Sequence, residues 1–311
     1  MISLLLVKKI AELFIYMLMG AVLVRAGLIK KEDSVAISTI ALYLMAPCMM
    51  IVSFQVDLSE TVRSGFMTAF LFAIGVHVVY IIIAELFARF SHGIPIETGS
   101  IIYVNSGNLI LPIVSSVLGP EWVIYSSAYT TVFNIFIWTH GRMLFEKNGK
   151  FSLASLKKIF LNVNVISIII GMIFLFSGVK ITGIPLQAMT TVGSAIGPAS
   201  MFVTGMLLGS MKLDELFKNH RIWLIILMRL LVCPLVILLI IKLFSLEEMI
   251  QSGSTIFLIS FLAAMAPQAA TINQFAILYK KDTSYASSIN ILSTLLCIGT
   301  MPLMVWLYEH I

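Results

Sequence analysis

Long apolar runs, separated by short clusters of charged and turn-forming residues, follow one another along the whole chain. A membrane-spanning helix needs about 20 mostly apolar residues. Backbone groups in hydrocarbon must pair within their own segment, and the sequence lacks the alternating pattern of a barrel, so helices are favoured. The pattern predicts ten transmembrane helices, at 9–26, 34–55, 66–88, 98–118, 121–141, 159–178, 186–208, 222–243, 255–276 and 285–307.

The composition agrees with an all-α integral membrane protein. Of 311 residues, 59% are hydrophobic and 11% charged, and the mean hydropathy is +1.03. A soluble domain has roughly 25% charged residues, and a disordered chain is poor in apolar ones. The three cysteines lie in apolar runs without disulfide or metal-ligand spacing, so we expect neither a metal nor a cofactor. The N-terminus has no signal-peptide cleavage pattern, and we interpret it as mature.

The basic residues predict the orientation. Cytoplasmic loops carry the excess of Lys and Arg, so the loops after the odd-numbered spans are expected inside and both termini outside a plasma membrane. The net charge of +5 then reflects this bias and not a nucleic-acid partner. The fourteen inner residues are Arg25, Lys30, Lys31, Arg89, Arg142, Lys147, Lys150, Lys157, Lys158, Lys212, Lys218, Arg221, Lys280 and Lys281. The five outer ones are Lys8, Lys9, Arg63, Lys180 and Lys242.

An internal repeat relates the two halves of the chain. A single offset of 151 residues superposes three helix-perturbing residues of the first half on three of the second, although coincidence is the alternative. The pairs are Gly20 with Gly171, Gly27 with Gly178, and Pro47 with Pro198. Five spans per half would invert the second half, as in many secondary transporters. We expect repeats at 1–142 and 159–311, joined by a cytoplasmic linker at 143–158.

Spans four and nine both contain a proline with polar neighbours near mid-membrane. Proline lacks an N–H and its ring clashes with the carbonyl four residues back, so Pro112 should free the carbonyl of Asn108. Pro267 should likewise free that of Ala263. Such groups need protein or a wet cavity around them. The alternative is a structural kink whose amides serve only these carbonyls. The candidate substrate site comprises Asn105, Asn108, Pro112, Pro267, Gln268, Thr271 and Asn273.

Two antiparallel broken helices that cross would point two half-helix N-termini into one site. Each end carries about +0.5 charge and unpaired N–H groups, which suits an anion. The pattern therefore predicts a small organic anion as the partner.

Few ionisable residues lie inside the predicted spans, and such residues are functional candidates. His77 could relay protons, with packing as the alternative. Glu85 could pair with Arg89 at i,i+4. Arg229 could reach the interface or hold an anion. No aspartate lies inside a predicted span, since Asp33, Asp57, Asp214 and Asp282 all fall in loops or at helix ends. This favours anions over cation exchange and leaves the coupling ion, proton or sodium, undetermined.

The chain resembles the auxin efflux carrier family, which includes plant auxin exporters and bacterial malate or malonate permease-like proteins. The segment from Asn105 through Leu111-Pro112 to Gly119 is similar to the family signature Asn-x5-[Ile/Leu]-Pro-x6-Gly. In span nine, Ala266-Pro267-Gln268 is similar to the family's Pro-Gln segment, with Phe275-Ala276 and Asp282 following as in the family. The resemblance covers essentially the whole chain.

The resemblance implies that Asn105 contacts the substrate carboxylate, opposite the break in span nine. The chain departs from the family at Ile110, where a glycine is frequent, and at Ile272, where plant exporters often have a second proline. Its middle loop is short. These departures favour a compact bacterial-type member that handles small carboxylates rather than indole-type substrates.

We therefore expect a secondary transporter and not an enzyme, with two inverted five-helix repeats and crossing broken helices four and nine. Sodium–proton antiporters and bile-acid symporters share this plan. Expected substrates are carboxylates such as malate, malonate or auxin-like acids, moved by alternating access. The alternatives are a sodium-coupled symporter of the bile-acid type and a ligand sensor on a transporter fold. Gly20, Gly27 and the Met-rich surfaces suit a homodimer interface as well as internal packing.

Overall fold

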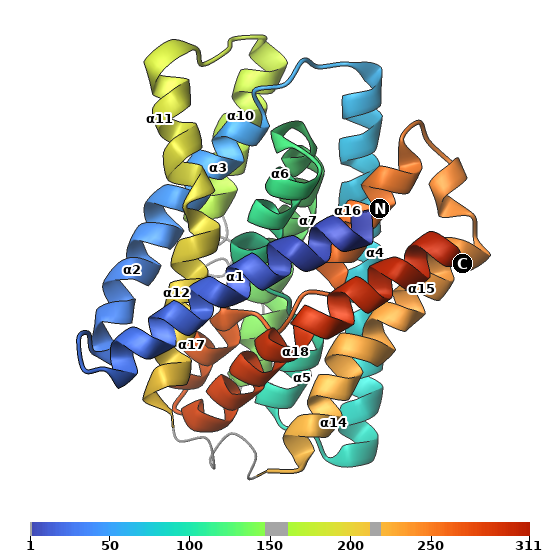
Figure 1. The fold of residues 1–311 in the computed structure, drawn as a ribbon. Helices are drawn as coiled ribbons and strands as arrows, with labels where there is room; N and C mark the ends of the chain where they lie inside the picture. Colours follow the sequence, from blue (N-terminus) through green and yellow to red (C-terminus); the bar gives the residue numbers. More distant parts are fainter. Residues whose placement is uncertain (1, 147–160, 212–218) are drawn as a thin grey trace.

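The computed structural model describes residues 2–146, 161–211 and 219–311. These residues form helices and no named strand (Figure 1). The first part holds α1 (Ile2–Arg25), α2 (Ser34–Ile40), α3 (Ala46–Ser53), α4 (Glu60–Ser91), α5 (Pro95–Ile102), α6 (Leu111–Val117), α7 (Val123–Phe136) and α8 (Arg142–Phe145). The rest holds α10 (Val163–Ser177), α11 (Gly183–Ser194), α12 (Ile196–Ser210), α14 (Arg221–Leu227), α15 (Cys233–Leu243), α16 (Gly253–Ala264), α17 (Ala270–Leu278) and α18 (Thr283–His310).

Helix is present in each of the ten predicted ranges. Five helical runs of the described chain are long and apolar enough to cross a membrane: Lys31–Ser53, Glu60–Ser91, Gly183–Ser210, Arg221–Leu243 and Thr283–His310. Three apolar helices are shorter: Ser106–Val117, Val163–Ser177 and Gly253–Ala264. The protein is thus a multi-pass membrane protein, while the count of ten spans stays a prediction. The predicted linker from 147 on, the start of span six, and Lys147, Lys150, Lys157, Lys158, Lys212 and Lys218 lie outside the described residues.

Wide helical turns explain how three prolines fit inside helical runs. Pro47, Pro112 and Pro234 each stand two residues after a π-helical segment, respectively η2 (Ala41–Met45), η3 (Ser106–Ile110) and η6 (Met228–Val232). A proline ring clashes with the carbonyl four residues back, and a π turn shifts that carbonyl out of register. The helical path therefore continues through these prolines.

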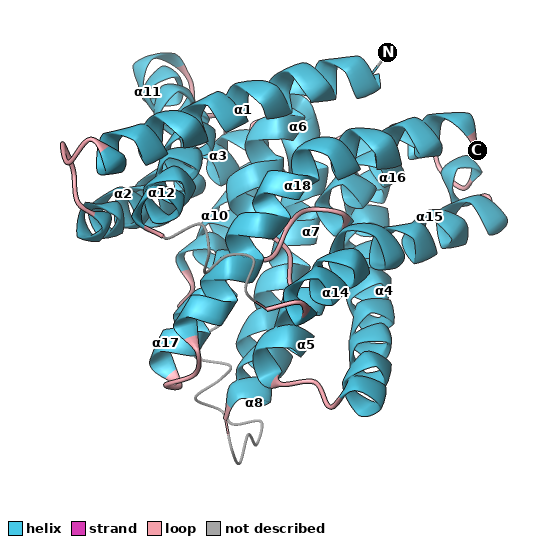
Figure 2. Cartoon of the chain, turned by 60° about the horizontal axis from the view of Figure 1, so that its bottom comes forward, coloured by secondary structure: helices cyan, strands magenta, loops and turns pink. Residues whose placement is uncertain are grey.

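The helices pack as two groups (Figure 2). In the first group, α1 packs on α12, and α3 packs on α10 and α11. In the second, α4 packs on α5, α7 and α16, and α18 packs on α14 and α17. Each group draws helices from both predicted halves of the chain, so the two halves interleave in space. Helices α1 and α18 lie side by side where the groups meet, with the N- and C-terminal ends at the same edge (Figure 1).

Helices α1 and α12 touch backbone to backbone. A Cβ atom on Gly205 would lie 1.9 Å from the carbonyl oxygen of Met17, and one on Gly209 would lie 2.6 Å from that of Ala21. From the other side, a Cβ on Gly20 would lie 2.4 Å from the carbonyl oxygen of Phe202. Small residues allow such close approach in membranes. Gly20 is therefore used for packing within the chain.

Two glycines that the predicted repeat pairs share a conformation. Gly27 follows α1 with φ +73° and Gly178 caps α10 with φ +71°. This left-handed region favours glycine and ends helices. The likeness agrees with the offset of 151 residues at these two helix ends.

Candidate functional site

The two predicted helix breaks meet in the structure. Span four is interrupted between α5 and η3, at residues 103–105, and span nine between α16 and α17, at residues 265–269. The two extended segments form an antiparallel bridge between Val104 and Gln268. Asn105 N–H donates to the Pro267 carbonyl at 2.9 Å, and Ala269 N–H donates to the Tyr103 carbonyl at 2.9 Å. The broken helices thus cross and bond to each other through their backbones.

The prolines differ in their relation to the breaks. Pro267 lies inside the break of span nine, and the carbonyl of Ala263, four residues back, accepts from the Ala266 N–H at 3.3 Å. The expectation that Pro112 interrupts span four is wrong in position, because Pro112 is the second residue of α6 and the chain is extended at Tyr103 instead. The π turn η3 absorbs Pro112.

The polar side chains of the candidate site surround this crossing. Asn105, Asn108, Thr271 and Asn273 are partly exposed, whereas Gln268 is buried. Gln268 Nε2 donates to Asn273 Oδ1 at 3.3 Å, and Gln268 Oε1 is buried without a hydrogen-bond partner among the described residues. Of the predicted residues, the structure therefore joins Gln268 to Asn273 by side chains and Asn105 to Pro267 by backbone.

Both half-helix N-termini at the crossing lack a side-chain cap. Asn105 precedes η3 and Ala269 precedes α17, and neither side chain accepts a hydrogen bond from the turn that follows. The first N–H groups of a helix have no partner within the helix. The crossing therefore presents two sets of backbone donors and two positive dipole ends.

The other two half-helices, α5 and α16, end at the crossing with their C-termini, and these ends meet a buried arginine. Arg229, in η6, is fully buried, and its guanidinium donates to the carbonyl oxygens of Ile101, Ala264 and Ala266. From the sequence, Arg229 is expected either to reach the interface or to hold an anion. In the structure its side chain does neither, since it stays in the interior and binds backbone oxygens.

The other two ionisable candidates form no hydrogen bond, ion pair or ring contact with the extended segments in the described part of the chain. His77 is buried in α4, where Nδ1 donates to the Ala73 carbonyl at 2.7 Å and the ring stacks on Phe136 at a centroid distance of 5.1 Å. Glu85 is exposed, and no ion pair with Arg89 is present among the described ion pairs. His77 thus packs in the interior, which is the alternative to a proton relay. The predicted Glu85–Arg89 pair is not formed.

Helix α18 supplies two contacts that sequence reasoning missed. Asn290 Nδ2 donates to the Gln268 carbonyl at 2.8 Å, and Ser293 Oγ accepts from the Gln268 N–H at 3.2 Å. Both residues are buried. Their signal in the sequence is a polar pair three residues apart on one helix face. These contacts satisfy both backbone groups of Gln268 and fix the break in span nine.

A buried carboxylate fixes the start of α5. Glu97 is 1% exposed, accepts from the Ile94 N–H at 3.0 Å and from the Tyr285 hydroxyl at 2.8 Å, and pairs with Arg221. Arg221 also donates to the Ser91 carbonyl at 2.7 Å. The end of α4 and the starts of α5, α14 and α18 are thereby held at one point. Sequence reasoning missed this cluster because its members are far apart in the chain.

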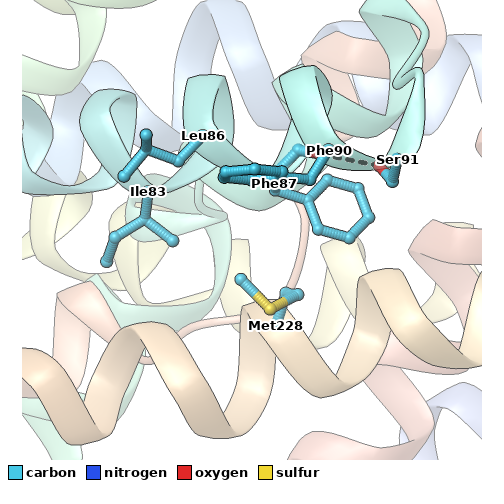
Figure 3. Close-up of a pocket in the computed structure, with 6 residues that line it drawn as sticks. All are labelled: Ile83, Leu86, Phe87, Phe90, Ser91 and Met228. Atoms are coloured by element: carbon cyan, nitrogen blue, oxygen red, sulfur yellow. Dashed lines mark hydrogen bonds between the residues drawn. The ribbon is translucent and has the colours of Figure 1, made fainter.

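Two hollows lie outside the crossing. An open apolar depression of about 420 Å³ lies between the end of α4 and η6, with Phe87, Phe90 and Met228 on its walls (Figure 3). A cleft of about 40 Å³ lies between α3, α6, α7 and α11 and includes Ser53 and Ser194. No group of three His, Cys, Asp or Glu side chains that could hold a metal occurs in the described ranges.

Comparison with known families supports the resemblance seen in the sequence. Residues 5–305 match the family described as membrane transport protein, which is the auxin efflux carrier family. This is a family of transporters and not of enzymes. No curated protein matches the chain. Because the match covers nearly the whole chain, the protein belongs to the auxin efflux carrier family of membrane transport proteins.

Proposed function

We propose that the protein is a secondary transporter that moves small organic anions, such as malate, malonate or auxin-like acids, by alternating access at the crossing of spans four and nine. The observation that carries this proposal is the meeting of two uncapped half-helix N-termini with partly exposed amides. Backbone N–H groups and positive helix ends bind carboxylates well. Asn105, Asn108 and Asn273 add neutral donors.

The amides suit an anion because they donate without adding a fixed charge. No hydrogen bond to the Asn105 or Asn108 side chain occurs within the described part of the chain, so both amides are available to a ligand. Each neutral amide can give two N–H donors. A carboxylate gains charge-assisted hydrogen bonds from such donors.

The packing of the helices supports alternating access. The crossing lies where the two helix groups meet, since η3 and α6 contact α12, and α6 contacts α1. A Cβ on Gly197 of α12 would lie 2.9 Å from Pro112 of α6. Rocking one group against the other would open the crossing to either side of the membrane in turn. The paired glycine conformations at Gly27 and Gly178 support the inverted repeat on which such rocking depends.

We further propose a plasma-membrane location with both termini outside, on the basis of the uneven distribution of basic residues. A cysteine placed at either terminus should then react with an impermeant maleimide on intact cells. Labelling only after the membrane is permeabilised would show that the termini lie inside.

Uptake assays in proteoliposomes test the transport proposal. Labelled malate, malonate and indole-acetate are offered separately, with and without sodium and with and without a proton gradient. We expect at least one carboxylate to accumulate, and Asn105→Ala to reduce its uptake by about tenfold or more, because the loss of one hydrogen bond to a charged group costs about 1.5–3 kcal/mol.

Gln187→Ala is the matched control, because Gln187 is an exposed amide on α11 away from the crossing. It should leave uptake unchanged. Uptake that survives Asn105→Ala unaltered would exclude the site, and the absence of carboxylate uptake in every condition would exclude the substrate class.

A further inference from the structure

The C-terminal ends of α5 and α16 bring three backbone carbonyl oxygens to one place. A half-helix C-terminus carries about −0.5 charge and unpaired carbonyl oxygens. Where broken helices cross in cation-coupled carriers, such ends and unwound carbonyls coordinate sodium or a proton. Here the corresponding oxygens belong to Ile101 at the end of α5, to Ala264 at the end of α16, and to Ala266 just beyond it.

A side chain of the protein already binds these three oxygens. Arg229 Nε donates to the Ala266 carbonyl at 3.0 Å and one terminal nitrogen donates to the Ile101 carbonyl at 2.9 Å, while the other donates to Ala264. The guanidinium also lies 5.0 Å from the Tyr80 ring centroid, and the Tyr80 hydroxyl donates to the Ala264 carbonyl at 3.0 Å. One cation therefore joins both broken spans.

The positive charge of Arg229 is offset without a carboxylate. None of the ion pairs formed by described residues includes Arg229, which is 0% exposed. A buried guanidinium is costly unless it is compensated. Two helix ends of about −0.5 each together offset its single positive charge. The charge of Arg229 is thus offset by the C-terminal ends of two helices. A free cation at this place would bind the same carbonyl oxygens.

We propose that Arg229 is a tethered cation that fills the cation site of the crossing, so that truncation of its side chain opens a binding site for a small free cation, with guanidinium as the best ligand. The inference concerns the C-terminal ends of α5 and α16, whereas the proposed anion site lies at the N-terminal ends of η3 and α17. As far as it bears on coupling, it rests on the proposed function: a carrier whose cation is covalently attached needs no sodium at this place.

Thermal unfolding of the purified full-length protein in detergent tests the inference without any substrate. Arg229→Ala removes the side chain and leaves room, and we expect its Tm to fall well below that of the wild type. Addition of about 10 mM guanidinium chloride should raise the Tm of the variant by roughly 2–4 °C and leave that of the wild type unchanged, because a ligand stabilises only the state that binds it.

Four controls make the result specific. Urea at the same concentration has the shape of guanidinium without its charge, and should give no recovery; sodium chloride at equal ionic strength should give less. Arg229→Met fills the volume without a charge, so it should be unstable and insensitive to guanidinium. Arg229→Lys keeps a cation and should unfold at a temperature between those of the wild type and Arg229→Met.

Equal effects of guanidinium and urea on Arg229→Ala, or no effect of either, would overturn the inference. If Arg229→Ala does not yield folded protein, the comparison of the Lys and Met variants decides, since a Lys variant no more stable than the Met variant also overturns it. The transport proposal is tested independently, because unfolding temperatures require no carboxylate and carboxylate uptake requires no truncation of Arg229.

Discussion

The contact between α1 and α12 and the crossing of spans four and nine hold helices together in opposite ways. At the first, Gly205, Gly209 and Gly20 let two backbones touch without polar side chains. At the second, the backbones leave the helical path and are bridged by hydrogen bonds, with Arg229 and Asn290 bound to the freed carbonyls.

The difference follows from what each place must do. Lipid tails give no hydrophobic force between helices, so close van der Waals packing holds a static contact. An irregular backbone in hydrocarbon is tolerated only when its polar groups are satisfied. The crossing satisfies most of these groups and leaves the two N-terminal ends uncapped. The glycine contact should therefore be disrupted by larger side chains. The crossing should be disrupted by the loss of hydrogen bonds.

The largest effect is expected at the glycine contact. Gly205→Leu drives a side chain into the Met17 carbonyl, which a Cβ alone would approach to 1.9 Å. We expect a loss of about 3 kcal/mol or more and little folded protein by size-exclusion chromatography. Gly75→Leu is the control, because a Cβ on Gly75 meets nothing within 4 Å, and it should behave as the wild type. Equal yields of the two variants would contradict the close contact.

Loss of the charge on Glu97 ranks second. Glu97→Gln leaves Arg221 without its carboxylate and alters bonds to Ile94 and Tyr285. Glu97 is buried but the Arg221 side chain is 36% exposed, so the loss should be about 2 kcal/mol, less than for a fully buried pair, and should appear as a lower Tm in detergent. Glu60→Gln, which alters an exposed pair with Arg63, should change the Tm little. Similar shifts in both variants would show that burial at Glu97 contributes nothing.

A smaller effect is expected from Asn290→Ala at the crossing. The change leaves the buried carbonyl of Gln268 without its donor, at a cost of about 1–2 kcal/mol. We expect a clear fall in the rate of carboxylate uptake and only a small fall in Tm, because Gln268 lies beside the N-terminus of α17. Thr294→Ala is the control, since among the described residues the Thr294 hydroxyl donates to the Asn290 carbonyl of its own helix and to no other segment. If uptake by Asn290→Ala equals that of Thr294→Ala, α18 does not position the break.

The smallest effect is expected from Tyr80→Phe. Its hydroxyl donates to the Ala264 carbonyl, which keeps Arg229 as a second donor, so the loss should be about 1 kcal/mol. Tyr129→Phe is the control, because the buried Tyr129 hydroxyl has no hydrogen-bond partner among the described residues. The Tm of Tyr129→Phe should equal or exceed that of the wild type. A greater loss in Tyr129→Phe than in Tyr80→Phe would contradict the assigned contacts.

Local signals in the sequence predicted the helices and the polar segments that meet. Apolar runs indicate spanning helices because lipid leaves few alternatives, and the Pro267-Gln268 segment indicates a break through the missing N–H. The family resemblance is confirmed by the match over residues 5–305. The roles of the individual site residues stay predictions.

Other features depended on contacts between distant segments. Residues Tyr103 and Val104 are extended without a proline, because the backbone beside Gln268 offers them a bridge partner. The π turn η3 carries Pro112 without a break. Arg229 is predicted to be functional by its charge in an apolar run, but its carbonyl partners lie 35 or more positions away in sequence. Such pairings cannot be read from local composition.

The bridge between Val104 and Gln268 also bears on the thermodynamics of a transport cycle. Two backbone hydrogen bonds join the interruptions of spans four and nine, so a displacement of one carries the other with it. In the proposed alternating-access cycle, the backbone donors at the crossing would then keep the same mutual positions in both orientations of the site. We therefore expect nearly equal intrinsic affinity on the two faces of the membrane, with the solute and ion gradients setting the direction of net flux.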